Sequence, residues 1–198
     1  RRRQAPRDDL ATALATAREG NDQLTQEELT TSVIGMFGAG FETTAHMIGN
    51  GLLALHHFPV QWQKLVADPS LATNATEEIL RYDSSLQATY RTALSNNQIG
   101  DQPIEQGQRV LLLLAAANRD PNVFDDPDEF DITRPDIKSL AFGGGIHFCI
   151  GASLARMEGR VTFSQLAKQF PDLQVDTINP KWREGFLFRG LAELQVRW

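Results

Sequence analysis

The longest regular pattern in the chain is helical. Thr25 and Glu28, three residues apart, have the form of a capping box, the reciprocal pairing that starts many helices. From Leu29 to about His57 no proline interrupts the pattern, and Pro59 follows. These signals predict one helix of about 32 residues, which at about 1.5 Å per residue is about 48 Å long.

Shorter helices are predicted on both sides of it. Residues 8–20 have a helical spacing of alanine, leucine and charge, which Gly20-Asn21-Asp22 breaks. Further helices are expected at 59–67, where Pro59 suits the first turn, and at 73–82. A last helix is expected from Ala152 to about Gln169, after a glycine-rich loop.

The β pattern is weaker and local. Residues 86–104 are β-branched and amide-rich, with turn signals at 95–97 and 100–101, and predict short antiparallel strands. The apolar run 110–117 fits a strand or a helix equally well, and a coil rich in proline and aspartate follows it to about Asp136. The tail after Pro171 is expected to form loops and short strands. The fold class is therefore mainly α with small antiparallel β-sheets.

Composition narrows the classes of function. The 198 residues carry 25 acidic and 19 basic side chains, a formal charge of −6, which argues against nucleic acid as the main partner. The basic cluster of Arg1, Arg2, Arg3 and Arg7 is explained by a flexible terminus. The single cysteine, Cys149, excludes a disulfide within the chain and any multi-cysteine metal site. The most apolar stretches are too short to span a bilayer, so a soluble cytoplasmic protein without a membrane partner is expected.

Three segments carry candidate chemistry, each with a plainer alternative. Residues 35–44 place three glycines inside the long helix, either to admit a flat ligand or to let another helix pack closely, with Glu42 in solvent. Glu78 and Arg81, one helical turn apart, are by themselves most simply a pair on a solvated helix face.

The third segment is the loop 142–151. Cys149 lies just before a helix, where free backbone N–H groups stabilise a thiolate, and is a candidate metal ligand or nucleophile. The plainer alternative is a small buried hydrophobic residue. A cysteine hydrolase with a histidine base and a phosphate-cradling loop rank low, because His147 is only two residues away and the Lys-Ser/Thr ending of a nucleotide loop is missing.

In this order, the three segments resemble the cytochrome P450 superfamily of haem-thiolate monooxygenases, in its soluble bacterial branch. The resemblance covers essentially the whole chain and implies that Cys149 is the axial ligand to the iron of haem b. It also implies roles for three further sets of residues. These are the cofactor-binding residues His147, Arg91, Phe142, Gly143, Gly145, Gly151, Ala39 and Gly40, the proton-handling pair Glu42 and Thr43, and the structural network of Glu78, Arg81 and Arg134.

The same resemblance implies a reaction and its partners. The expected activity is insertion of one atom of O2 into a C–H bond of a small apolar organic substrate. The expected source of the two electrons is a ferredoxin with its ferredoxin reductase. Residues 1–198 would be the C-terminal part of a single domain whose N-terminal part is absent, so the segment alone is expected to be inactive. A non-catalytic haem-binding or electron-transfer module is the alternative.

Overall fold

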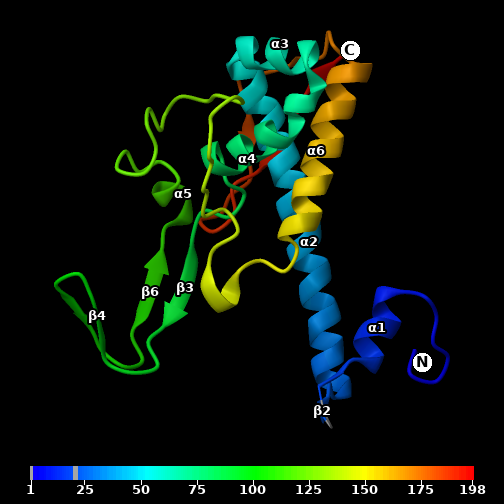
Figure 1. Cartoon of the computed structure of the whole chain (residues 1–198), viewed down its shortest axis with the longest axis vertical. Helices are drawn as coiled ribbons and strands as arrows, with labels where there is room; N and C mark the ends of the chain where they lie inside the picture. The colour runs from blue at the N-terminus through cyan, green and yellow to red at the C-terminus, as the bar shows by residue number, and fades with distance from the viewer. Residues whose placement is uncertain (1, 20–21) are drawn as a thin grey trace. The chain divides into compact units, whose positions relative to one another are not determined.

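The computed structural model describes residues 2–19 and 22–198, which form helices and short strands (Figure 1). The helices are α1 (Leu10–Thr16), α2 (Gln26–His57), α3 (Pro59–Ala67), α4 (Ala72–Tyr82), α5 (Leu114–Ala117) and α6 (Ala152–Gln169), with single 3-10 turns at Pro69–Leu71 and Gly145–His147. The strands are β1 (Arg18–Glu19), β2 (Asp22–Gln23), β3 (Thr89–Thr92), β4 (Asn97–Ile99), β5 (Gln102–Ile104), β6 (Arg109–Leu112), β7 (Gln174–Val175), β8 (Lys181–Trp182), β9 (Leu191–Glu193) and β10 (Val196–Arg197).

The chain divides into two compact units, Arg1–Glu42 and Thr43–Trp198, and the division falls inside α2. In the first unit, Asp9 caps α1 by accepting a hydrogen bond from the Thr12 backbone N–H at 2.8 Å. The capping box of α2 is formed in both directions. The Thr25 N–H donates to the Glu28 carboxylate at 2.8 Å, and the Glu28 N–H donates to the Thr25 hydroxyl at 3.2 Å.

The second unit holds the hydrophobic core. Apolar side chains of α2, α3, α4 and α6 bury one another there, with Leu55, Leu65, Ile79 and Phe163 fully buried. Figure 1 shows α6 beside the part of α2 that belongs to this unit. Gly159 makes the close approach of α6 to α4 possible, because a Cβ there would lie 2.5 Å from Thr76 Cγ2.

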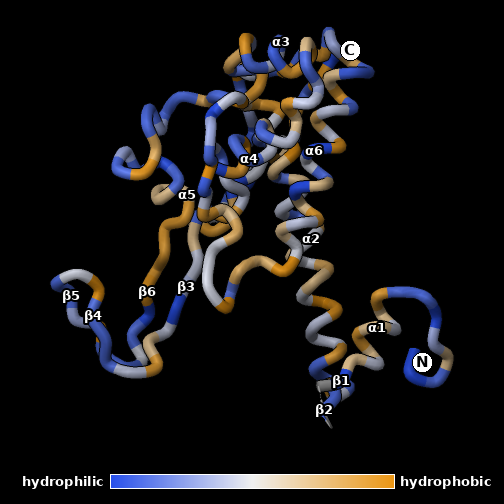
Figure 2. Tube along the Cα trace, in the orientation of Figure 1, coloured by the Kyte–Doolittle hydropathy of each residue, from blue (hydrophilic) through white to orange (hydrophobic). Residues whose placement is uncertain are grey.

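The strands pair in five two-stranded antiparallel sheets within the described ranges. The pairs are β1–β2, β3–β6, β4–β5, β7–β10 and β8–β9. In the second unit, β3 pairs with β6 from Thr89 opposite Leu112 to Thr92 opposite Arg109. Figure 2 shows β6 as largely hydrophobic. None of the helices in the described ranges is both long enough and apolar enough to cross a membrane.

Most predicted elements are confirmed, with three corrections. The helix expected at 8–20 ends at Thr16, because Arg18 and Glu19 pair with β2 instead; Gly20 and Asn21 lie outside the described residues. The apolar run 110–117 is both strand and helix, since pairing with β3 ends at Leu112 and α5 follows. Within 86–104, β4 and β5 form the expected hairpin, but β3 pairs with a strand beyond that range.

Candidate functional site

The loop before α6 is held in shape by its own backbone. The Cys149 N–H donates to the Phe142 carbonyl at 3.0 Å, and the Phe148 N–H donates to the Gly145 carbonyl at 3.0 Å. Gly143 and Gly145 have φ of 68° and 64°, a conformation that glycine adopts without strain. Gly151 precedes α6, and the Ala152 N–H donates to the Cys149 carbonyl at 3.2 Å. Cys149 therefore has a defined place immediately before the helix.

The surroundings of Cys149 fit a large apolar group that a thiolate anchors. The cysteine is exposed, and Ile146, Phe148 and Ile150 beside it are 98%, 52% and 90% exposed. Exposed apolar side chains gathered around one thiol gain stability when an apolar surface covers them. A Cβ at Gly151 would lie 3.8 Å from Cys149 Sγ, an ordinary contact distance, so the backbone of Gly151 passes near the sulfur. An exposed cysteine sulfur within an apolar surface fits a haem group that takes a cysteine as its axial ligand.

Glu78 and Arg81 form a buried ion pair on α4. Both side chains have no exposed surface, and Arg81 Nε and Nη2 donate to the two Glu78 carboxylate oxygens at 2.7 and 2.8 Å. Arg81 also donates to the carbonyls of Asn118, Pro127 and Glu129 at 2.8–3.0 Å. The solvated-face alternative is wrong. Instead, the pair ties α4 to the coil that leads toward the cysteine loop.

Arg134 joins this pair from the coil. Its Nε lies 3.4 Å from Glu78 Oε1, and its other guanidinium nitrogens donate to the carbonyls of Asp125, Asp126 and Glu129. The structure therefore brings Glu78, Arg81 and Arg134 together. One carboxylate faces two guanidinium groups, and those two groups donate to backbone carbonyls of the coil.

Sequence reasoning assigned no such role to two residues that connect α4 and its coil to the loop. Buried Asn118 accepts the Leu140 N–H at 2.6 Å through its side chain, just before the loop. Arg156 of α6 forms an ion pair with Glu77 at 2.5 Å and lies over the Phe142 ring, 4.6 Å from its centroid. Neither residue has a local pattern that signals its role, because its partners are far away in the sequence.

His147 and Arg91 lie on separate elements. His147 is exposed in the turn Gly145–His147, and Arg91 is on β3, where it donates to the Tyr90 carbonyl at 2.8 Å. Among the described residues, neither side chain forms an ion pair with a carboxylate. No contact between His147 and Arg91 is seen there.

The middle of α2 contains Ala39, Gly40, Glu42 and Thr43. Ala39 and Gly40 are exposed, and Glu42 and Thr43 are partly buried. A Cβ built at Gly35, Gly38 or Gly40 meets no atom of the described part of its own unit within 4 Å. The Thr43 carbonyl accepts a hydrogen bond from the Ser85 hydroxyl at 2.9 Å.

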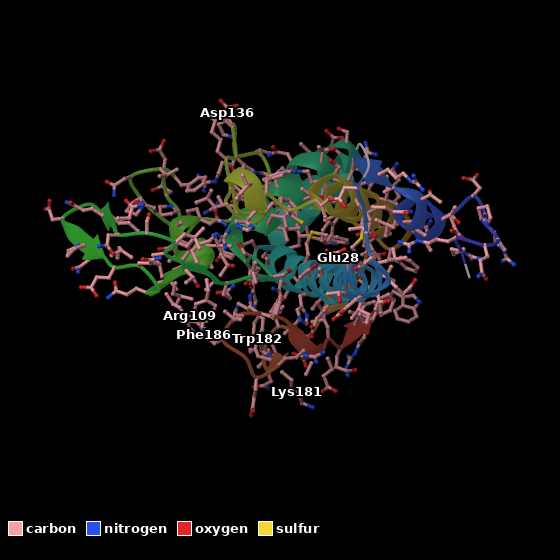
Figure 3. All side chains as sticks on the ribbon, turned by 90° about the horizontal axis from the view of Figure 1, so that it is seen from below. Glu28, Arg109, Asp136, Lys181, Trp182 and Phe186 are labelled. Carbon is pink, nitrogen blue, oxygen red and sulfur yellow. The ribbon has the colours of Figure 1, made fainter. Side chains whose placement is uncertain are left out.

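A cavity of about 290 Å³ lies in the second unit between α5 and the C-terminal segment. Its wall includes Leu113, Trp182, Phe186 and Phe188. Figure 3 shows Trp182 and Phe186 projecting from the same C-terminal segment. The wall is mainly apolar and suits an organic molecule with few polar groups.

Beside the cavity, Asp83 is a titratable group with a perturbed environment. Burial raises the pKa of its carboxyl, and the charge and hydrogen bond of Arg189, whose Nε lies 2.8 Å from Asp83 Oδ1, oppose that rise without cancelling it.

Comparison with known proteins gives one consistent family. The family model for cytochrome P450 matches residues 1–70 and 59–188. Cytochrome P450 107B1 of Saccharopolyspora erythraea is 45% identical over the whole chain and 49% of its own length. The vitamin D(3) 25-hydroxylase of Pseudonocardia autotrophica is 44% identical over 99% of this chain and 50% of its own.

A solved structure shows the same backbone arrangement. P450BioI, in complex with an acyl carrier protein ligated to hexadec-9Z-enoic acid, matches with a TM-score of 0.93 and 41% identity. The match covers all of this chain and 50% of that one. The chain spans about half the length of the curated relatives it matches. On the family model and these identities, this chain belongs to the cytochrome P450 family.

Proposed function

We propose that the protein to which these residues belong is a haem-thiolate monooxygenase in which Cys149 is the axial ligand. The observation that carries the proposal is the exposed Cys149 thiol on a backbone-braced loop, rimmed by exposed apolar side chains. When bound, the haem b would supply the chemistry, activating O2 and inserting one oxygen atom into a C–H bond of a small apolar organic substrate.

The residues around the loop would bind and orient the cofactor. Phe142, Gly143, Gly145 and Gly151 would shape the loop that carries the sulfur. The positive φ values of Gly143 and Gly145, and the backbone hydrogen bonds that the Phe142 and Gly151 carbonyls accept, support this role. His147 and Arg91 would bind the haem propionates through charge-assisted hydrogen bonds, which direct an otherwise apolar group. The network of Glu78, Arg81 and Arg134 would hold the coil that leads into this loop.

The middle of α2 would handle protons. Ala39 and Gly40 lack bulky side chains and would leave room beside the cofactor. The Thr43 hydroxyl would pass protons to the reacting centre, and the Glu42 carboxylate would replenish them. This acid-and-alcohol pair supports the use of O2 with a ferredoxin and ferredoxin reductase as separate electron donors.

We further propose that residues 1–198 are the C-terminal part of a single domain of a cytoplasmic protein. Matches that cover about half the length of each relative support a longer parent protein. The relatives named as hydroxylases support hydroxylation as the reaction. Activity would then belong to the intact protein, and this segment alone would bind haem weakly and turn over nothing.

The test compares Thr43→Ala and Thr43→Ser in the intact haem-loaded protein with its reductase. Thr43→Ala, which lacks the hydroxyl, is expected to release a larger share of the supplied electrons as hydrogen peroxide. Thr43→Ser, which keeps the hydroxyl, is expected to stay near the parent. A haem carrier without oxygenase activity would show equal peroxide release in all three proteins, and that result would overturn the proposal.

A further inference from the structure

Ser85 makes one contact that the proposed function does not use. Its side chain lies three residues beyond α4 and is only 7% exposed. The Ser85 hydroxyl donates to the Thr43 backbone carbonyl at 2.9 Å, across 42 residues of sequence. This contact reaches the residue to which we assign proton handling.

One backbone hydrogen bond and two contacts with α2 hold the segment that contains Ser85. The Ser85 carbonyl accepts the Arg189 N–H at 2.8 Å, and the Arg189 carbonyl accepts the Asn50 side-chain amide at 3.0 Å. Next to it, Gly190 lies so close to His46 that a Cβ there would be 1.9 Å from the ring nitrogen Nδ1. Positions 43, 46 and 50 are three and four residues apart, so they share one helix face. Contacts other than the Ser85 hydroxyl bond therefore hold Ser85 in place beside Thr43.

A second hydrogen bond to a helix carbonyl has a defined consequence. A backbone carbonyl has two lone pairs, and in a helix one of them accepts the N–H four residues on. A side-chain hydroxyl that donates a hydrogen bond to the second lone pair fixes the direction of that peptide group. The peptide group that contains the Thr43 carbonyl is bonded to the Thr43 Cα. Fixing this peptide group therefore restricts where the Thr43 side chain lies. Losing the bond would leave this turn freer without releasing the segment on the other side.

We propose that Ser85 is a positioning residue for Thr43. By holding the Thr43 carbonyl it fixes the turn of α2 that presents the Thr43 hydroxyl for proton transfer. The inference rests on the proposed function, since it assigns Ser85 a part in the same reaction. It also links that turn, through the Arg189 N–H, to the segment of Phe186 and Phe188 that lines the cavity.

The chain offers a matched control one residue away. Ser84 is 1% exposed, its hydroxyl donates to the Leu80 carbonyl at 2.6 Å, and it accepts the Asn118 side-chain amide at 2.9 Å. Both serines are buried; alanine removes one side-chain hydrogen bond at position 85 and two at position 84. The Ser84 hydroxyl bonds within α4 and to Asn118, so a purely structural effect should appear in Ser84→Ala as well.

The experiment uses Ser85→Ala, Ser85→Thr, Ser84→Ala and Thr43→Ala in the intact haem-loaded protein. The first readout is amide hydrogen exchange of residues 44–48, measured without turnover. The second is the share of electrons released as peroxide with substrate present. Ser85→Ala should speed the exchange by about two- to tenfold, the change that one net hydrogen bond represents. It should also raise peroxide release toward the Thr43→Ala level.

The controls separate the positioning role of Ser85 from the proposed function of the whole protein. Ser85→Thr, which keeps a hydroxyl, should restore slow exchange and low peroxide release, and Ser84→Ala should leave both at the parent level. Suppose that Thr43→Ala releases more peroxide, while Ser85→Ala matches Ser84→Ala in amide exchange and in peroxide release. The role of Ser85 is then refuted and the proposed function stands. If Thr43→Ala stays fully coupled, the proposed function fails and the inference falls with it.

Discussion

Replacing Arg81 with methionine removes a guanidinium group from a site with no exposed side-chain surface. Glu78 loses two hydrogen bonds, at 2.7 and 2.8 Å, and the carbonyls of Asn118 and Pro127 lose their Arg81 donor. Removing one partner of a buried ion pair costs about 3–5 kcal/mol, because a buried charge is left without compensation. Each stranded carbonyl adds about 1 kcal/mol. Arg134 remains 3.4 Å from Glu78 and offsets part of the loss.

We therefore expect Arg81→Met to lower the free energy of unfolding by about 3–5 kcal/mol, a large part of the roughly 5–15 kcal/mol typical of a native protein. Urea unfolding followed by far-UV circular dichroism measures the loss. Arg134→Met is the matched control. We expect it to lose only about 1 kcal/mol, because its bond to Glu78 is long and its hydrogen bonds to the coil carbonyls are exposed, so water can replace them.

A double variant tests the cause. Glu78→Met with Arg81→Met removes both charges that have no exposed surface, and Arg134 keeps its hydrogen bonds to the coil carbonyls. The double variant should therefore be less destabilised than Arg81→Met alone. A loss below about 1 kcal/mol for Arg81→Met, or a double variant as unstable as the sum of the singles, would refute the reasoning that a buried, mutually compensating pair holds α4 to the coil.

Three further predictions concern packing and pH. Gly159→Ala should lower the free energy of unfolding by about 1–3 kcal/mol, because its Cβ would meet Thr76. Gly35→Ala, whose Cβ would meet no described atom of its own unit within 4 Å, should raise it by up to about 1 kcal/mol, since alanine favours a helix more than glycine does. Equal effects in urea unfolding would contradict this packing. Burial raises the folded-state pKa of Asp83 above 3.8, so its protonation stabilises the fold at low pH, and that stability is lost as pH rises through the raised pKa. Asp83→Asn should flatten this part of the pH dependence of the free energy of unfolding, and parallel curves for the parent and the variant would refute the prediction. Hydrogen bonds from the Thr25 N–H and hydroxyl lower the pKa of Glu28 below 4.5. The stabilisation of α2 by the Glu28 carboxylate is therefore present above pH 4.5 and lost as pH falls through the lowered pKa. Circular dichroism should show a loss of helix in that pH range that Glu28→Gln does not show.

The long helix α2 was predictable because the signals at its two ends are local. The capping box at Thr25 and the proline at position 59 lie within a few residues of the ends of α2. The run 110–117 was not predictable, because its division at Leu112 depends on pairing with β3, about 20 residues earlier in the chain. Apolar periodicity does not carry that information.

The candidate site was predictable only where a motif is compact. The loop of Cys149 stands out from glycine density around one cysteine. Glu78 and Arg81 by themselves favour a solvated pair, and only the packed coil around them makes them a buried one. Ser85 and Asn118 carry no local signal, since their partners Thr43 and Leu140 come from other elements.

The most direct test of the account is the absorption spectrum of the dithionite-reduced protein with carbon monoxide. It is recorded for this chain and for the intact protein, each reconstituted with haem, together with Cys149→Ser and Cys149→His. The account predicts the long-wavelength Soret band of thiolate ligation in the intact protein and its loss in both variants. A thiolate band that persists without Cys149, or one absent from the intact protein, would contradict the assignment of this cysteine as the iron ligand.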